Sequence, residues 1–166
     1  MFGDNIPLLL NGATHCPPPS ALLLTLAAMN ILLVEDNPGD VRLTQEALKE
    51  GQIAHQLTTV ADGEAALQYL LDPQHPRPDL IFLDLNLPRK DGREVLAEIK
   101  QDRSTSMIPI IVLTTSEAEQ DIQQSYGLHA NCYITKPVDI NQFIDVIKSV
   151  EKFWFRTATL PRPTGS

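Results

Sequence analysis

The sequence predicts a doubly wound α/β fold, in which a parallel sheet of five strands carries helices on both faces. Two observations lead to this prediction. Across residues 30–154, short aliphatic runs alternate five times with stretches whose apolar residues recur at helical spacing. The runs at 31–34 and 80–83 are apolar at every position, which is typical of parallel strands buried on both faces. Five such units predict a flavodoxin-like (βα)5 topology with strand order 2-1-3-4-5.

The first unit shows how each element is delimited. Its strand, 31–34, is followed by Asp36 and Asn37, either of which can cap a helix, and by Pro38, which suits the first helical turn. The helix ends at Gly51, a residue type that favours helix C-termini. The other expected elements are strand 56–60, helix 64–71, strand 80–83, helix 92–101, strand 108–113, helix 117–126, strand 132–134 and helix 140–154.

Composition narrows the class of protein. The 166 residues include 13 Lys and Arg against 21 Asp and Glu, a net charge of -8. Such a charge repels nucleic-acid phosphates and anionic lipids, so we expect neither nucleic acid nor membrane as a partner. Cys16 and Cys132 match no zinc or disulfide pattern. This cysteine usage predicts a reduced, cytoplasmic protein.

The ends of the chain differ from its middle. Residues 1–28 contain Asp4 but no Lys or Arg, and their apolar runs are too short to span a bilayer. We therefore expect residues 1–28 to be a non-functional extension, with Met29 as a possible true start. The folded domain is predicted at 29–155, followed by a tail at 156–166 that is too short for a DNA-binding output module.

Polar residues follow four of the predicted strands at the point where each strand ends. Glu35 and Asp36 follow the first, Asp84 the third, Thr114 the fourth and Lys136 the fifth. The carboxyl ends of parallel strands meet at one edge of the sheet, where such folds place their chemistry. Three carboxylates at this edge would repel one another without a cation. An all-oxygen cluster of this kind suits Mg²⁺.

These residues stand within motifs that resemble those of response-regulator receiver domains. The matching segments are Val34-Glu35-Asp36-Asn37, Leu83 to Pro88 with Asp91-Gly92, Leu113-Thr114, and Tyr133 to Pro137. They occur in order and span residues 29–152. Within the family, the chain most resembles the stand-alone regulators that partner cyanobacterial phytochromes. The partners that this resemblance implies are a sensor histidine kinase such as a phytochrome, and a downstream target or phosphotransfer protein.

The resemblance implies a role for each residue of the acidic cluster. Asp84 would be the phosphoacceptor, forming 4-aspartylphosphate. Glu35, Asp36, Asp84 and the backbone carbonyl of Asn86 would hold Mg²⁺. Glu35 departs from the family pattern, because many members have Asp there.

The remaining roles concern charge and switching. Lys136 would neutralise the transferring phosphoryl group, as a compact point charge can. Thr114 would donate its hydroxyl to that group, and Tyr133 would change rotamer when Thr114 moves. Thr115 stands where the family usually has a smaller residue.

Alternative functions remain open at this point. An aspartate-based phosphatase of the haloacid dehalogenase type needs a second Asp where Asn86 stands, and a flavodoxin-type carrier needs a phosphate loop that Glu35 and Asp36 would repel. The stronger alternative is a degenerate receiver that acts as a phosphorylation-independent interaction module. We expect a signalling protein that is not an enzyme beyond its own Mg²⁺-dependent phosphotransfer and dephosphorylation.

Aromatic residues at the end of the last predicted helix indicate an interface. Ile140, Phe143, Ile147 and Trp154 follow the helical spacing and are expected to cover the sheet, whereas Phe153 and Phe155 fall off that stripe. Apolar surface of this kind often marks a contact. We therefore expect a twofold homodimer with Phe153 and Phe155 at or near the interface. The alternative is that both rings fold back over the edge of the last predicted strand of their own chain.

Overall fold

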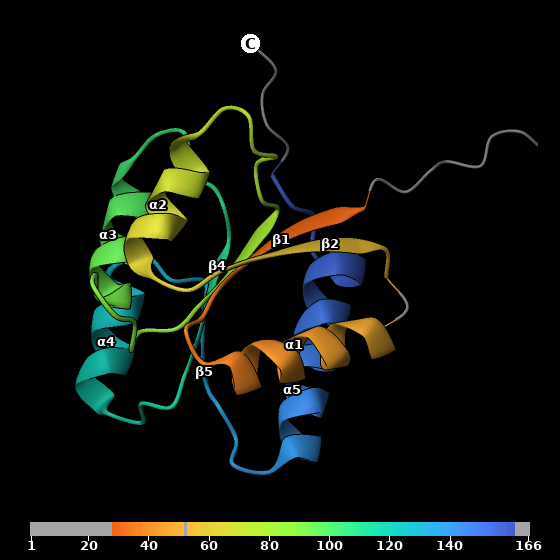
Figure 1. Cartoon of the computed structure of the whole chain (residues 1–166). Helices are drawn as coiled ribbons and strands as arrows, with labels where there is room; N and C mark the ends of the chain where they lie inside the picture. The colour runs from red at the N-terminus through yellow and green to blue at the C-terminus, as the bar shows by residue number, and fades with distance from the viewer. Residues whose placement is uncertain (1–27, 52, 162–166) are drawn as a thin grey trace, which may run out of the picture.

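The computed structural model describes residues 28–51 and 53–161. Five parallel strands form one sheet in the order β2-β1-β3-β4-β5 (Figure 1), which confirms the predicted fold class and topology. Apart from residue 28, the predicted extension 1–28 lies outside the described residues, as do residues 162–166 of the predicted tail.

The elements follow the predicted order. The strands are β1 (Met29–Val34), β2 (His55–Val60), β3 (Leu80–Leu83), β4 (Ile110–Thr114) and β5 (Cys132–Thr135). The helices are α1 (Pro38–Glu50), α2 (Gly63–Leu71), α3 (Gly92–Gln101), α4 (Glu119–Gly127) and α5 (Ile140–Lys152), and a π-helical turn (Phe153–Thr157) follows α5.

Two hydrophobic cores lie on opposite faces of the sheet. Helices α1 and α5 cover one face, and α2, α3 and α4 cover the other (Figure 1). Strand β1 alternates between them: Leu32 and Val34 enter the core under α2 and α3, whereas Ile31 and Leu33 enter the core under α1 and α5. This double burial explains why the strand is apolar at every position of the run.

The element boundaries lie within two residues of the sequence prediction, and the differences at β4, α4 and α5 are described in turn. Strand β4 begins at Ile110 and not at residue 108, because Pro109 has no N–H to pair in the sheet. Helix α4 begins two residues later than expected, at Glu119. Helix α5 gives way at Phe153 to the π-helical turn, which changes the direction of the side chains that follow.

The π-helical turn separates the two phenylalanines predicted to lie together at an interface. Phe155 is half-buried and packs against the core under α1 and α5. Phe153 is 53% exposed and meets Trp154 edge-on, with ring centroids 5.3 Å apart. At the other end of α5, Ile140 is 55% exposed, so the expectation that it covers the sheet is wrong.

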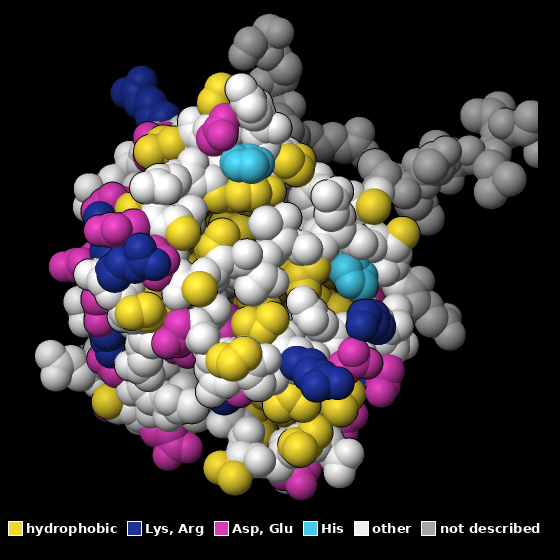
Figure 2. All heavy atoms as spheres, in the orientation of Figure 1, with side chains coloured by type: hydrophobic (Ala, Val, Ile, Leu, Met, Phe, Trp, Pro, Cys, Tyr) yellow, Lys and Arg dark blue, Asp and Glu magenta, His cyan; other side chains and the backbone are white. Residues whose placement is uncertain are grey.

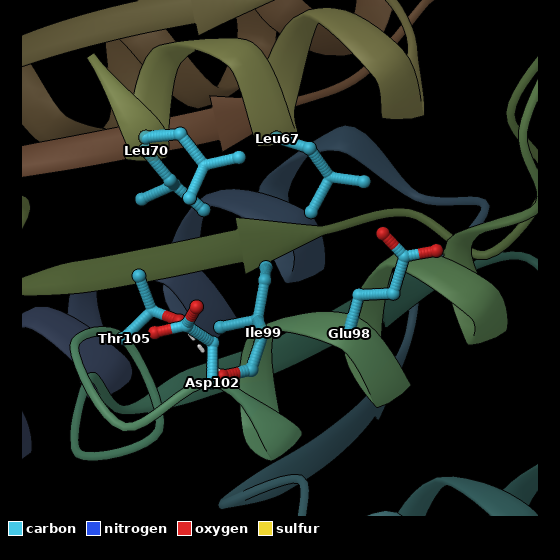
Figure 3. Close-up of a pocket in the computed structure, with 7 residues that line it drawn as sticks. Leu67, Leu70, Glu98, Ile99, Asp102 and Thr105 are labelled. Carbon is cyan, nitrogen blue, oxygen red and sulfur yellow. Dashed lines mark hydrogen bonds between the residues drawn. The ribbon is translucent and has the colours of Figure 1, made fainter.

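The surface of the domain carries charges of both signs. Acidic and basic side chains are interspersed over α3 and α1 on the face shown in Figure 2. Between α2 and α3 lies a hollow of about 80 Å³, to which α2 contributes Leu67 and Leu70 and α3 contributes Glu98 and Ile99 (Figure 3). These side chains come from the C-terminal halves of both helices, away from the carboxyl ends of the strands.

One buried carboxylate lies at the end of the domain opposite the acidic cluster. Glu151, near the C-terminus of α5, is 3% exposed, and its Oε1 has no hydrogen-bond partner among the residues that the structure describes. Burial raises the pKa of the Glu151 carboxyl, although His55, Arg156 and Lys148 act against this rise. Folding therefore favours the protonated form of this group.

Candidate functional site

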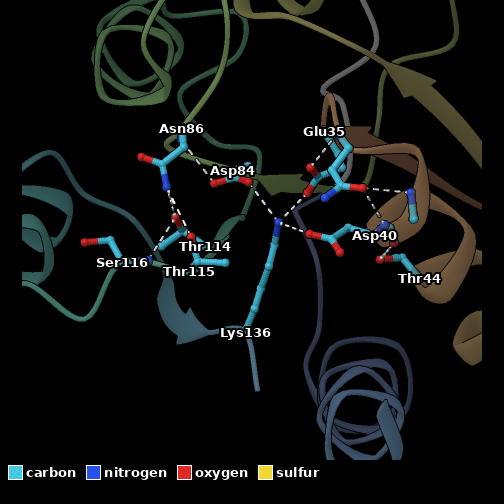
Figure 4. Close-up of polar contacts among 11 residues, drawn as sticks. Glu35, Asp40, Thr44, Asp84, Asn86, Thr114, Thr115, Ser116 and Lys136 are labelled. Carbon is cyan, nitrogen blue, oxygen red and sulfur yellow. Dashed lines mark hydrogen bonds and ion pairs between the residues drawn. The ribbon is translucent and has the colours of Figure 1, made fainter. Parts of the chain in front are cut away.

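Four strand ends bring the predicted polar residues together. Glu35 follows β1, Asp84 follows β3, Thr114 ends β4 and Lys136 follows β5 (Figure 4). All four are buried, with exposed fractions of 8% or less. The parallel register explains this meeting, because Val34 pairs with Leu83 and Thr114 pairs with Thr135.

The ammonium group of Lys136 lies at the centre of this edge. It donates hydrogen bonds to Asp84 Oδ2 at 2.8 Å, to Asp40 Oδ2 at 2.8 Å and to Glu35 Oε2 at 2.5 Å (Figure 4). Burial alone would lower the pKa of Lys136, but these three acceptors together raise it above its ordinary value. The ammonium is therefore charged at neutral pH and lies in direct contact with the Asp84 carboxylate.

Glu35 holds the start of the loop after β1. Its Oε1 accepts the N–H of Asn37 at 3.0 Å, and Asn37 in turn caps α1 by accepting the N–H of Gly39 at 2.8 Å. Asn37, and not Asp36, is therefore the N-cap of α1, and Asp36 is exposed. Burial raises the pKa of the Glu35 carboxyl, and the hydrogen bond from Lys136 opposes that effect.

Three carboxylates lie close enough together to hold a divalent cation. Glu35, Asp36 and Asp84 each offer an oxygen, and these oxygens lie within 4.8 Å of one another. Asn86 is fixed beside them because its N–H donates to Asp84 Oδ1 at 3.0 Å. Hard oxygen donors with few carboxylates fit an ion such as Mg²⁺, which keeps part of its water shell.

Thr114 and Tyr133 lie on a hydrogen-bonded path that leaves the acidic cluster. Thr114 Oγ1 accepts from Asn86 Nδ2 at 3.3 Å and from the N–H of Ser116 at 3.4 Å. The Tyr133 hydroxyl donates to the Ser116 carbonyl at 3.0 Å. Thr115 also accepts from Asn86 Nδ2, at 3.4 Å. Asn86 therefore bridges the end of β3 to the end of β4.

A close backbone approach sets the position of Asp84. The N–H of Gly92, the first residue of α3, donates to the Leu85 carbonyl at 3.0 Å. A Cβ atom at Gly92 would lie 2.1 Å from the Asp84 carbonyl oxygen and 2.6 Å from Leu85 Cα. Only glycine allows α3 to begin this close to the acidic cluster.

Sequence reasoning missed Asp40 as a partner of Lys136. Asp40 is in the first turn of α1, four positions after Asp36, where it resembles an ordinary residue that complements the helix dipole. Its position one turn into a helix that begins at the acidic edge was the available signal. Sequence reasoning also missed the pairing of Arg93 with Asp121, which joins α3 to α4.

This fold and site belong to a known class of signalling protein. Residues 31–148 match the family model of the response regulator receiver domain, and the chain belongs to that family. Among the residues that the structure describes, no helix is long and apolar enough to cross a membrane.

Relatives within the family include phytochrome-linked regulators. Response regulator Rcp1 of Synechocystis sp. is 51% identical over 135 residues, covering 79% of this chain and 92% of Rcp1. The structure of the phosphorylated cyanobacterial phytochrome response regulator RcpA matches with a TM-score of 0.79 and 53% identity, covering 82% of this chain and 100% of RcpA. The Mn²⁺-bound form of Rcp1 matches with a TM-score of 0.78 and 50% identity, covering 81% and 99%.

Proposed function

We propose that residues 29–155 form a cytoplasmic receiver domain that accepts a phosphoryl group on Asp84 from a histidine kinase and signals through protein contacts. The observation that carries this proposal is the contact of the buried Lys136 ammonium with the Asp84 carboxylate, 2.8 Å apart at the carboxyl edge of the sheet. An ammonium at this position can neutralise the charge of the Asp84 carboxylate and, after phosphorylation, part of the charge of the phosphoryl group.

The chemistry follows from the positions of the side chains. A carboxylate oxygen of Asp84 forms a bond to phosphorus while the bond to the histidine nitrogen of the kinase breaks, and the electron pair stays on that nitrogen. Lys136 stabilises charge on the phosphoryl oxygens, and the Thr114 hydroxyl turns to donate to one of them. Glu35, Asp36, Asp84 and Asn86 would hold Mg²⁺, which supplies further positive charge when bound.

The proposed kinase is a phytochrome. The similarity to RcpA, named as a phytochrome response regulator, and to Rcp1 supports this choice. The proposed downstream partner, to which this protein passes the signal, is a target protein or a phosphotransfer protein. Mg²⁺ is proposed as the physiological ion because the donor set consists of oxygen atoms alone.

A twofold homodimer completes the proposal, with Phe153 at the contact. Its exposed ring supports this placement, whereas Phe155 packs on its own chain and would lie only at the border of such an interface. Light scattering across a concentration series tests it. We expect Phe153→Ser to give a folded monomer, and a wild type that is monomeric at tens of micromolar, with and without beryllofluoride, would show that the interface does not exist.

Phosphorylation is tested with purified protein, Mg²⁺ and acetyl phosphate, followed by transfer from a phosphorylated phytochrome kinase. We expect one phosphoryl group per chain in the wild type and none in Asp84→Asn. A degenerate receiver would respond neither to acetyl phosphate nor to beryllofluoride, and that result would overturn the proposed function. Phosphotransfer from other histidine kinases, but not from phytochromes, would overturn only the choice of partner.

A further inference from the structure

Arg93 forms an ion pair between two helices that border the proposed phosphorylation site. Its Nε donates to Asp121 Oδ1 at 3.1 Å, and its Nη2 lies 2.6 Å from Asp121 Oδ2. Arg93 belongs to α3 and Asp121 to the first turn of α4. Both side chains are largely covered, with exposed fractions of 20% and 18%. A two-point pair of this kind fixes orientation as well as distance.

The same carboxylate is joined to the path that starts at Thr114. The Ser116 hydroxyl donates to Asp121 Oδ2 at 2.5 Å and also accepts the N–H of Ala118 at 3.3 Å. Ser116 in turn donates its own N–H to Thr114 Oγ1. Hydrogen bonds from Arg93, the larger effect, and from Ser116 hold the pKa of Asp121 below its usual value. The Asp121 carboxyl is therefore charged at neutral pH. An unbroken series of polar contacts therefore runs from Thr114 to Arg93.

Helix α4 has few other contacts to hold it. Of its nine residues, all of which the structure describes, only Ser125 is buried. Ala118 precedes the helix and has no side chain that can cap it. Helices held by few buried apolar groups are the ones whose position a single polar contact can decide. The Arg93–Asp121 pair is thus a principal tie between α4 and α3.

We propose that Arg93 is a positioning residue that holds α4 in its unphosphorylated position and thereby opposes the response of Thr114 to phosphorylation of Asp84. This inference rests on the proposed function. To donate to a phosphoryl group, Thr114 must reorient the hydroxyl that now accepts from Ser116. That movement frees the Ser116 N–H and shifts the loop into α4, where Ser116 and Arg93 share the same Asp121 oxygen.

The test measures how tightly the full-length protein binds beryllofluoride, a phosphoryl mimic, in the presence of Mg²⁺. Removing a restraint on the inactive position raises the population that can respond, so Arg93→Ala and Asp121→Asn should each bind about threefold to tenfold more tightly. Arg93 Nη1 also donates to Asp91 Oδ2 at 2.9 Å, a contact at the start of its own helix that Arg93→Ala removes and Asp121→Asn keeps. The double variant should gain little beyond either single change, because the Arg93–Asp121 pair that joins the two helices is lost in both. Arg93→Lys keeps the charge but loses the two-point geometry, so its affinity should lie between those of wild type and Arg93→Ala.

Lys148→Ala is the matched control. It breaks an ion pair with Glu50 that also joins two helices, α5 and α1, but at the far ends of these helices from the acidic cluster. We expect its beryllofluoride affinity to equal that of the wild type. A lower melting temperature with unchanged affinity in both Arg93→Ala and Asp121→Asn would show a purely structural role.

Two further outcomes separate this inference from the proposed function. If the wild type binds beryllofluoride but the Arg93 and Asp121 variants bind equally well, or their effects add, only the role of Arg93 is overturned. If the wild type does not bind, both proposals fall. Should Arg93→Ala not fold, Asp121→Asn and Arg93→Lys decide the result, read from the affinity and from the amide resonances of α4.

Discussion

Replacing Gly92 with alanine tests whether the start of α3 sets the position of Asp84. The new Cβ would lie 2.1 Å from the Asp84 carbonyl oxygen and 2.6 Å from Leu85 Cα, and both are backbone atoms that cannot rotate away. Because Cβ contacts below 3.0 Å are essentially never seen, α3 and the end of β3 must separate by about 1 Å.

The magnitude follows from this separation. Forcing one extra carbon into a packed site costs about 1–3 kcal/mol, and contact with the backbone of Asp84 and Leu85, which cannot rotate away, places Gly92→Ala at the upper end. The displacement also moves the Asp84 carboxylate relative to Lys136. A misplacement of about 1 Å at a reacting centre lowers the rate of reaction about 100-fold.

Two measurements check this reasoning, urea unfolding and the rate of phosphorylation by acetyl phosphate. Gly127→Ala is the control, because a Cβ at Gly127 meets nothing within 4 Å. Gly127→Ala should change the free energy of unfolding by less than about 1 kcal/mol, in the stabilising direction, and leave the rate unchanged. The reasoning is refuted if Gly92→Ala matches Gly127→Ala in both measurements.

Four further substitutions have distinct expected outcomes. Asp84→Asn should block phosphorylation in an acid-labile phosphate assay while leaving the free energy of unfolding unchanged or slightly higher, because Lys136 keeps two carboxylate partners. Glu151→Gln should raise the free energy of unfolding at pH 7 and lose this advantage toward pH 4. Because the pKa of Glu151 is raised in the folded protein, the fold keeps a proton that the unfolded chain releases. Ionisation of Glu151 therefore destabilises the folded protein as the pH rises above about 4.3. Urea titrations at a series of pH values check the sign, and parallel curves for variant and wild type would contradict it. Phe155→Ser should lower the free energy of unfolding by about 2–3 kcal/mol, because the ring packs on the core. Phe153→Ser should lower it by less than about 1 kcal/mol, because that ring is exposed. Equal losses in urea unfolding would contradict the packing described for the π-helical turn.

Much of the fold could be predicted because its signals are local. The run 80–83 is apolar throughout, and β3 has these bounds. Gly92 follows Asp91, which caps α3, and the helix begins where the sequence predicts. The predicted boundaries were wrong where a contact with a residue distant in the sequence determines where an element begins or ends. The π-helical turn after α5 depends on how Phe155 reaches the core, and helical periodicity does not contain that information.

The acidic edge was predictable for the same reason, since strand ends can be read from the sequence. Asp40 was not, because its partner Lys136 is 96 residues away. Arg93 and Asp121 are 28 residues apart on two surface helices, where charged residues are ordinarily solvated. Only the packing of α3 beside α4 shows that these two charges meet.

The Lys136 ammonium has a consequence for how the protein is made. Its three carboxylate partners precede it in the chain by 101, 96 and 52 residues. During synthesis, Glu35, Asp40 and Asp84 leave the ribosome well before their cation, and contacts of such long separation close last. A nascent chain that stops before β5 therefore presents acidic groups without this counter-charge. The proposed phosphoacceptor site is therefore complete only after β5 and Lys136 have been synthesised and have joined the sheet.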